Sequence, residues 1–200
     1  MSGFAGAVLC GGASRRMGRD KALLEVDGRP LALRVADALR RAGAVAVTAV
    51  GGDLPALAAL GLPAVADLAP GEGPLTGILT ALDAAGDEPV VFVAACDLVA
   101  PDAAAVSATV AALVADPGSD VALPVVGGRR QWMHAAWRPR ASAPLAAAFA
   151  AGERAVHAAV AAGSLRVLEV TVAPGAVADA DTPEDLDFLR AVTRRAADPA

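Results

Sequence analysis

Strand-like and helix-like segments alternate from one end of the chain to the other, and this alternation constrains the fold more than any other feature. Short apolar runs rich in valine and alanine are separated by longer segments in which apolar residues recur every three or four positions. Strands are predicted at residues 4–10, 44–50, 64–66, 89–95, 121–126 and 165–172, and helices at 30–43, 54–60, around 78–82, 101–114, 144–150, 154–162 and 182–192. Such an order predicts a Rossmann-like α/β fold, with a mostly parallel sheet and helices on both of its faces.

Two segments refine this prediction. The run at 89–95 is the most hydrophobic, so we place it in the middle of the sheet. After the strand at 121–126, Gly127 and Gly128 form a turn, and residues 132–137 then follow as its predicted hairpin partner. We therefore expect one antiparallel strand in an otherwise parallel sheet.

Length and charge limit the class of protein. The 200 residues suit one domain, and we expect residues 1–200 to form it, with a frayed tail at 196–200. A net charge of −5 argues against a nucleic-acid-binding protein, whose surface would be basic. No apolar run is long enough to span a membrane, and no basic segment precedes the first apolar stretch as in a secretory signal. We expect a cytoplasmic protein in which Cys10 and Cys96 are buried free thiols.

The loop after the first strand has the composition of a polyphosphate site. It begins with Gly11 and Gly12, which let the backbone approach an anion closely, and successive loop N–H groups can form an anion-binding concavity. Positive charge follows at Arg15, Arg16, Arg19 and Lys21. The spacing matches neither the P-loop nor the dinucleotide-binding pattern. The loop predicts binding of a nucleoside triphosphate, with Lys21 neutralising phosphate charge and the preceding Asp20 orienting it.

Carboxylates follow three other predicted strands, where ligands of open α/β sheets bind. Asp97 ends the most hydrophobic run, Asp67 follows the short strand at 64–66, and Asp179 and Asp181 come after the last strand. Mg²⁺ prefers a few carboxylates together with phosphate oxygens and water, so Asp97 is the first candidate metal ligand. Each acid also has a structural interpretation: Asp97 as the cap of the next helix, Asp67 as part of a loop, and the segment of Asp179 and Asp181 as only the start of a helix capped by Thr182.

The first loop reads L-x-G-G-x-x-x-R-M-G-x-D-K over residues 9–21 and resembles the entry loop of the molybdenum cofactor guanylyltransferases. The resemblance continues, in that family's order, through D-x-x-x-x-x-G-P-L-x-G at 67–77, C-D with a later proline at 96–101, and T-P-E-D-L at 182–186. It implies a nucleotidyltransferase-type fold and transfer of GMP from GTP to molybdopterin or Mo-molybdopterin. Pyrophosphate is released and molybdopterin guanine dinucleotide is formed. The implied cofactor is Mg²⁺, and other cofactor-biosynthesis or acceptor proteins are implied partners.

The same resemblance assigns residues to roles. Lys21, Arg16 and Asp97 are the implied catalytic residues, with Asp97 also the metal ligand. The implied nucleotide-binding residues are Leu9, Cys10, Gly11, Gly12, Lys21, Asp67, Gly73, Pro74, Leu75 and Gly77. Asp179 and Asp181 stand where the family often has asparagines and are the implied acceptor-binding residues.

Two alternatives stay open. The Gly11-Gly12 pair is typical of the guanylyl type, but the aspartates at 179 and 181 leave a molybdopterin cytidylyltransferase possible. The second alternative is a nucleotide-binding sensor or cofactor chaperone with the same fold and no catalytic activity. Residues 128–134 correspond to an acceptor-facing strand in the family, where Trp132 either stacks on a pterin or simply packs. His134 has no acid–base partner in the sequence pattern, and we expect it to be structural.

Overall fold

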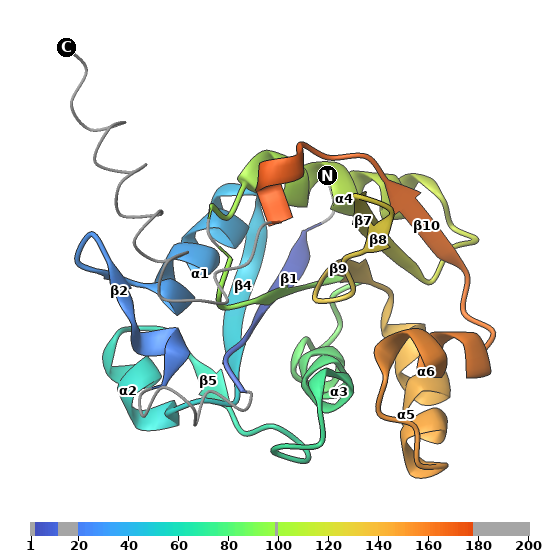
Figure 1. Cartoon of the computed structure of the whole chain (residues 1–200), viewed down its shortest axis with the longest axis horizontal. Helices are drawn as coiled ribbons and strands as arrows, with labels where there is room; N and C mark the ends of the chain where they lie inside the picture. The colour runs from blue at the N-terminus through green and yellow to red at the C-terminus, as the bar shows by residue number, and fades with distance from the viewer. Residues whose placement is uncertain (1–2, 12–19, 99, 178–200) are drawn as a thin grey trace.

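The computed structural model describes residues 3–11, 20–98 and 100–177, and these form an α/β sandwich (Figure 1). Its main sheet has the strand order β10-β7-β9-β6-β1-β4-β5, with β8 paired to β7 outside this path. The strands are β1 (Phe4–Leu9), β4 (Ala44–Val50), β5 (Ala64–Val65), β6 (Val91–Ala95), β7 (Val121–Val126), β8 (Arg129–Arg130), β9 (His134–Trp137) and β10 (Val167–Val170). β6 lies in the interior of the sheet, as its hydrophobicity predicted.

Most of the sheet is parallel. β1 pairs in parallel with β4 and β6, β4 with β5, and β7 with β10, whereas β9 runs antiparallel to both β6 and β7. The expected antiparallel strand is therefore present. The predicted partner of β7 is confirmed, since Val121 of β7 lies opposite Trp137 of β9 in an antiparallel pair. Next to the Gly127-Gly128 turn, a further strand of two exposed residues, β8, also pairs with β7 and was not predicted. Both glycines have positive φ, which a two-residue hairpin turn favours. β9 begins later and inserts between β7 and β6.

A second, two-stranded ribbon follows the first loop and was not predicted. Its strands β2 (Glu25–Val26) and β3 (Arg29–Pro30) are antiparallel and joined by Asp27 and Gly28, both with positive φ. An Asp-Gly pair is a common hairpin turn, so the sequence held the signal, although the strands are too short to show alternation.

Helices cover both faces of the sheet (Figure 1). α1 (Leu31–Arg41) and α4 (Ala103–Ala115) pack on one face, where Phe92 of β6 and Leu39 of α1 belong to the same buried cluster. The opposite face carries α3 (Pro74–Ala84), α5 (Ser142–Ala150) and α6 (Val156–Ala162), packed against a second buried cluster. The remaining helical segments are α2 (Leu54–Ala59), η2 (Lys21–Leu23), η3 (Pro139–Ala141) and η4 (Pro174–Val177). Both faces of β1 are buried, which accounts for its unbroken apolar sequence.

Several boundaries follow directly from sequence signals. β4 and β7 have the predicted bounds. α3 begins at Pro74, earlier than predicted, so the Gly-Pro-Leu-Thr-Gly motif forms the start of the helix. Proline suits the first helical turn because its missing N–H would have no partner there, and Gly73 precedes it with φ of 101°. Among the described residues, no helix is long and apolar enough to cross a membrane.

Candidate active site

Four strands end together at one edge of the sheet and bring the predicted site segments into contact. Cys10 N, just after β1, donates to Val50 O of β4 at 2.8 Å, and Gly51 N donates to Val65 O of β5 at 2.9 Å. On the other side of β1, Cys96 N after β6 donates to Leu9 O at 3.1 Å. The loops that carry Gly11, Asp67 and Asp97 therefore leave the sheet side by side.

Gly11 lies in close contact with two neighbouring loops. A Cβ added to Gly11 would lie 3.5 Å from Asp67 Oδ2, and one added to Gly51 would lie 3.0 Å from the Cα of Gly11. Gly51 also has φ of 73°, so both space and conformation favour glycine there. The N–H of Gly11 donates to Val50 O at 3.2 Å and is thus engaged within the sheet. Any loop N–H groups that bind phosphate would have to come from beyond Gly11.

Lys21 and Asp97 form an ion pair at the end of β6. Lys21 Nζ lies 2.7 Å from Asp97 Oδ2, and their side chains are 16% and 21% exposed. Lys21 is the only lysine in the chain, and all the other lysine-or-arginine positions are arginines. Asp97 does not cap the following helix, since Asp102 does so by accepting from Ala104 N at 2.8 Å. The structural interpretation of Asp97 as a cap is therefore wrong.

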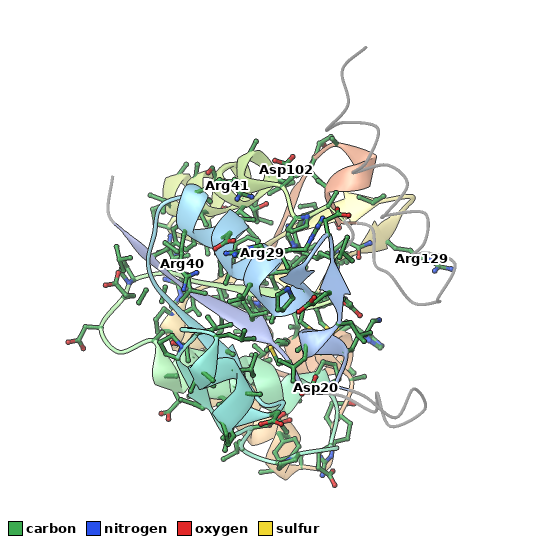
Figure 2. All side chains as sticks on the ribbon, turned by 90° about the vertical axis from the view of Figure 1, so that its left-hand side faces the viewer. Asp20, Arg29, Arg40, Arg41, Asp102 and Arg129 are labelled. Atoms are coloured by element: carbon green, nitrogen blue, oxygen red, sulfur yellow. The ribbon has the colours of Figure 1, made fainter. Side chains whose placement is uncertain are left out.

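Asp20 has a different role from the one expected. Its Oδ1 accepts from Ala22 N at 2.9 Å and caps η2, while its Oδ2 accepts from Asp53 N at 2.8 Å. Figure 2 shows Asp20 beside the start of α2. Asp20 thus fastens the segment that carries Lys21 to the loop after β4, and Asp97 is what binds the lysine amine. An Asp two residues before a helical N–H is a recognisable capping pattern, but its second partner is 33 residues away.

The 67–73 loop is fixed to α3 by side-chain hydrogen bonds. Leu68 N donates to Thr80 Oγ1 at 2.9 Å, and the buried Thr76 donates to Gly73 O at 3.0 Å. Asp67 Oδ1 accepts from Ala69 N at 3.1 Å, which turns the loop back toward the helix. Glu72 forms an ion pair with Arg154 at 2.6 Å. The loop is therefore held at both ends.

Other residues assigned to the nucleotide have side chains inside the core. Leu9 and Leu75 belong to the buried cluster under α3, and Gly77 allows α3 to approach, since a Cβ there would lie 3.1 Å from Leu9 Cδ2. Gly73 and Pro74 are exposed at the start of α3. For Leu9, Leu75 and Gly77, any contact with a nucleotide would have to come through the backbone.

Cys10 and Cys96 are free and buried, as expected. A hydrogen bond with Cys10 and burial together raise the pKa of the Cys96 thiol well above its ordinary value. A protonated, buried thiol is a poor nucleophile. Both cysteines therefore act in packing at the floor of the site, and the described geometry does not offer a covalent nucleophile there.

The part of the chain that the structure describes offers a magnesium ion few ligands. No group of three His, Cys, Asp or Glu side chains gathers anywhere in residues 3–11, 20–98 and 100–177. Asp97 Oδ1, however, is buried and has no hydrogen-bond partner among the described residues. One carboxylate oxygen fits the way Mg²⁺ binds at nucleotide sites, where phosphates and water complete its coordination.

A pocket of about 130 Å³ lies on the other side of the β6 end. It is lined by Ala95, Leu98, Arg130, Gln131, Trp132, Met133 and His134. His134 is 3% exposed, neither of its ring nitrogens has a partner among the described residues, and burial lowers its pKa to about 4. Trp132 packs 6.5 Å from Trp137 between ring centroids. The sequence pattern did not indicate that His134 would border a pocket, because the position of His134 depends on β9 lying next to β6 in the sheet.

Four assigned residues lie outside the described part of the chain. Gly12 and Arg16 fall within residues 12–19, and Asp179 and Asp181 fall within residues 178–200, as do the predicted helix after Thr182 and the tail at 196–200. Their roles stay predictions.

The family model for the MobA-like NTP transferase domain matches residues 6–168, a range that includes every strand end described above. The chain belongs to this family. The MobA-like NTP transferase domain is a nucleotidyltransferase domain, so the enzyme class implied by the first loop is confirmed. The mostly parallel α/β fold is that of nucleotidyltransferases as well.

Curated relatives and solved structures are consistent with this membership. A protein of Rhodobacter capsulatus named molybdenum cofactor guanylyltransferase is 37% identical over 92% of this chain and 93% of its own length. A Chloroflexus aggregans protein named probable molybdenum cofactor guanylyltransferase is 37% identical over 78% of this chain and 76% of its own length. The crystal structure of molybdopterin-guanine dinucleotide biosynthesis protein A from Archaeoglobus fulgidus has a TM-score of 0.76 at 22% identity, covering 96% and 99% of the two chains.

Proposed function

We propose that this MobA-like NTP transferase is a molybdenum cofactor guanylyltransferase, which transfers GMP from GTP to molybdopterin or Mo-molybdopterin. The observation that carries the proposal is the Lys21–Asp97 pair beside the first loop, at the edge where four strands end. The names of the curated relatives supply the substrates, and two of these relatives match most of the chain.

In the proposed reaction, an oxygen of the acceptor's terminal phosphate attacks the α-phosphorus of GTP. A new P–O bond forms there, the bond from the α-phosphorus to the bridging oxygen breaks, and pyrophosphate leaves. No protein nucleophile is required, which agrees with the buried, protonated Cys96. Catalysis then rests on positioning and on stabilising negative charge.

Lys21 and Asp97 have complementary tasks in this scheme. The ammonium of Lys21 has three donors, so it can keep its bond to Asp97 Oδ2 while donating to a phosphate oxygen. Asp97 Oδ1 faces no partner among the described residues and would hold Mg²⁺. When bound, Mg²⁺ supplies Lewis-acid stabilisation of phosphate charge. Asp67 lies beside Gly11, and in this scheme it borders the nucleotide.

The test is pyrophosphate release on mixing the protein with Mg²⁺, molybdopterin and either GTP or CTP. We expect release and molybdopterin guanine dinucleotide with GTP, and much slower turnover with CTP. Faster turnover with CTP would identify a cytidylyltransferase, and GTP binding without turnover would indicate a sensor. Lys21→Ala and Asp97→Asn should each lower kcat about 10²-fold or more, as expected for loss of one preorganised electrostatic group. Asp83→Asn, an exposed change on α3, is the matched control.

A further inference from the structure

Lys21 is held from both sides of β1, the strand that leads into the site. β1 pairs with β4 on one side and with β6 on the other. Lys21 Nζ lies 2.7 Å from Oδ2 of Asp97, which follows β6. The preceding residue, Asp20, accepts at 2.8 Å from the N–H of Asp53, which follows β4. Residues 20 and 21 therefore link the loops after β4 and β6, two strands that lie about 10 Å apart because β1 separates them.

The backbone of Lys21 is fixed by its two neighbours in sequence. Asp20 Oδ1 accepts from Ala22 N at 2.9 Å and caps η2, while Asp20 Oδ2 accepts from Asp53 N. Ala22 is fully buried and belongs to the core cluster under α1. Lysine carries its charge at the end of a flexible four-carbon stem. Fixing the backbone on both sides therefore limits the region in which the ammonium can lie.

The turn after β4 leaves room for the Asp20 carboxylate. Gly52 has φ of 77°, and a Cβ added there would lie 3.1 Å from Asp20 Oδ2 and 3.0 Å from Cys10 Cβ. The carboxylate of Asp53 is used elsewhere, since it caps α2 by accepting from Ala56 N at 3.1 Å. Asp20 is thus bonded to the backbone of residue 53 and not to its side chain. Only proline at position 53 would remove this donor.

We propose that Asp20 is a positioning residue for the reaction, which holds Lys21 beside Asp97 by anchoring it to the N–H of Asp53. Lys21 can stabilise phosphate charge only where its ammonium meets the reacting groups, and a displacement of about 1 Å can lower a rate about 10²-fold. The inference rests on the proposed function for the reaction that Lys21 assists. The position of the amine can be measured without that reaction.

The experiment breaks the bond between Asp20 and Asp53 from either end. Asp20→Ser keeps an oxygen that can cap η2, but serine has one oxygen where aspartate uses two, so Asp53 N loses its acceptor. Asp53→Pro removes the N–H at a residue whose φ of −80° suits proline. Asp53→Ala removes the α2 cap and keeps the N–H. Asp102→Ser is the matched control, because Asp102 caps α4 through Ala104 N at 2.8 Å as Asp20 caps η2. Urea unfolding shows which variants fold.

The effect should appear in kcat. With GTP, molybdopterin and Mg²⁺, we expect Asp20→Ser and Asp53→Pro each to lower kcat about tenfold or more. Asp53→Ala should keep a kcat at least about fivefold above that of Asp53→Pro, and Asp102→Ser should behave as wild type. Since Asp20 acts through Lys21, adding Asp20→Ser to Lys21→Ala should lower kcat no further. Wild-type kcat in folded Asp20→Ser, or additive losses in the double variant, would overturn the inference.

A spectroscopic measurement follows the amine directly. Lys21 is the only lysine in the chain, so protein grown with isotopically labelled lysine gives a single side-chain ammonium signal in NMR. Asp20→Ser should change the chemical shift of this signal in the free protein, and Asp102→Ser should not. A changed signal supports the positioning role even if no GMP is transferred. An unchanged signal rejects that role even if the enzyme is a guanylyltransferase.

Discussion

Replacing His134 by phenylalanine should remove a pH-dependent contribution to stability. In the folded protein burial lowers the pKa of His134 from 6.5 to about 4, whereas the unfolded chain keeps the ordinary value. Between these two values the unfolded state binds more protons, so acid destabilises the fold. The stability that His134 contributes as a neutral group is fully present above about pH 6.5 and is lost as the pH falls toward about 4.

The size of the effect follows from the difference in pKa. At pH 5 the medium is about 1.5 units below the unfolded pKa, and each unit corresponds to about 1.36 kcal/mol, so His134 should cost the fold about 2 kcal/mol relative to pH 7.5. With a side chain only 3% exposed, solvent screening reduces this little. The His134→Phe variant keeps a ring against Phe92 and has no titratable group, so it should not show this loss.

The measurement is urea unfolding of wild type, His134→Phe and His157→Phe at pH 7.5 and pH 5, with His157, an exposed histidine on α6, as the matched control. Other groups also titrate in this range, so the informative quantity is the difference between proteins. Wild type and His157→Phe should lose about 2 kcal/mol more than His134→Phe on acidification. At pH 7.5, His134→Phe should equal or exceed wild type, since a buried imidazole without a partner is replaced by an apolar ring. Equal losses in all three proteins would show that His134 is solvated or hydrogen-bonded in solution.

Three further predictions concern the glycine loop, the far end of the sheet and the catalytic amine. Gly52→Ala should be at least about 1 kcal/mol more destabilising than Gly61→Ala in urea unfolding, because both have φ near 76° but only at Gly52 would the new Cβ meet Cys10 Cβ, at 3.0 Å. Asp120→Asn should lower the free energy of unfolding by about 1–2 kcal/mol near pH 7, since Asp120 accepts from Arg140 at 2.6 Å and from Arg166 N at 2.8 Å. Burial raises the pKa of Asp120, but these hydrogen bonds outweigh it and leave the pKa below its ordinary value. The difference between the variant and wild type should therefore shrink as the pH falls below about 4. Amine-directed labelling followed by peptide mapping should modify Lys21, the only lysine, more slowly with GTP and Mg²⁺ present, and an unchanged rate would argue against contact between Lys21 and the triphosphate.

Much of the fold could be predicted because its signals are local. The hydrophobic run of β6 indicated an interior strand, and Gly127 with Gly128 indicated a tight turn. Strand order is not local. The pairing of β9 with β7 was predicted, but its simultaneous pairing with β6 depends on which strand edges remain free after folding, and nothing in residues 132–137 indicated it.

The same limit applies to the site. Sequence reasoning identified Lys21 and Asp97 separately, but their contact joins residues 76 positions apart and follows from the pairing of β1 with β6. The link between Asp20 and Asp53 follows in the same way from the pairing of β1 with β4. His134 carried no local signal, because an isolated histidine in an apolar strand is ordinarily structural. Its position beside a pocket appears only when β9 is placed next to β6.

Several buried polar atoms without hydrogen-bond partners lie close to the candidate active site. Asp97 Oδ1 and the two ring nitrogens of His134 lack partners among the described residues, and both residues lie near the same end of β6, since Asp97 follows this strand and His134 pairs with its Ala94. Trp137 Nε1 also lacks one, but Trp137 pairs with Val91 at the opposite end of β6. Each unsatisfied group costs the free protein stability that a bound partner would restore. Nucleotide with Mg²⁺ should therefore raise the unfolding temperature of the wild-type protein, and Asp97→Asn should remove most of that shift, whereas an equal shift in Asp97→Asn would show that Asp97 Oδ1 takes no part in binding.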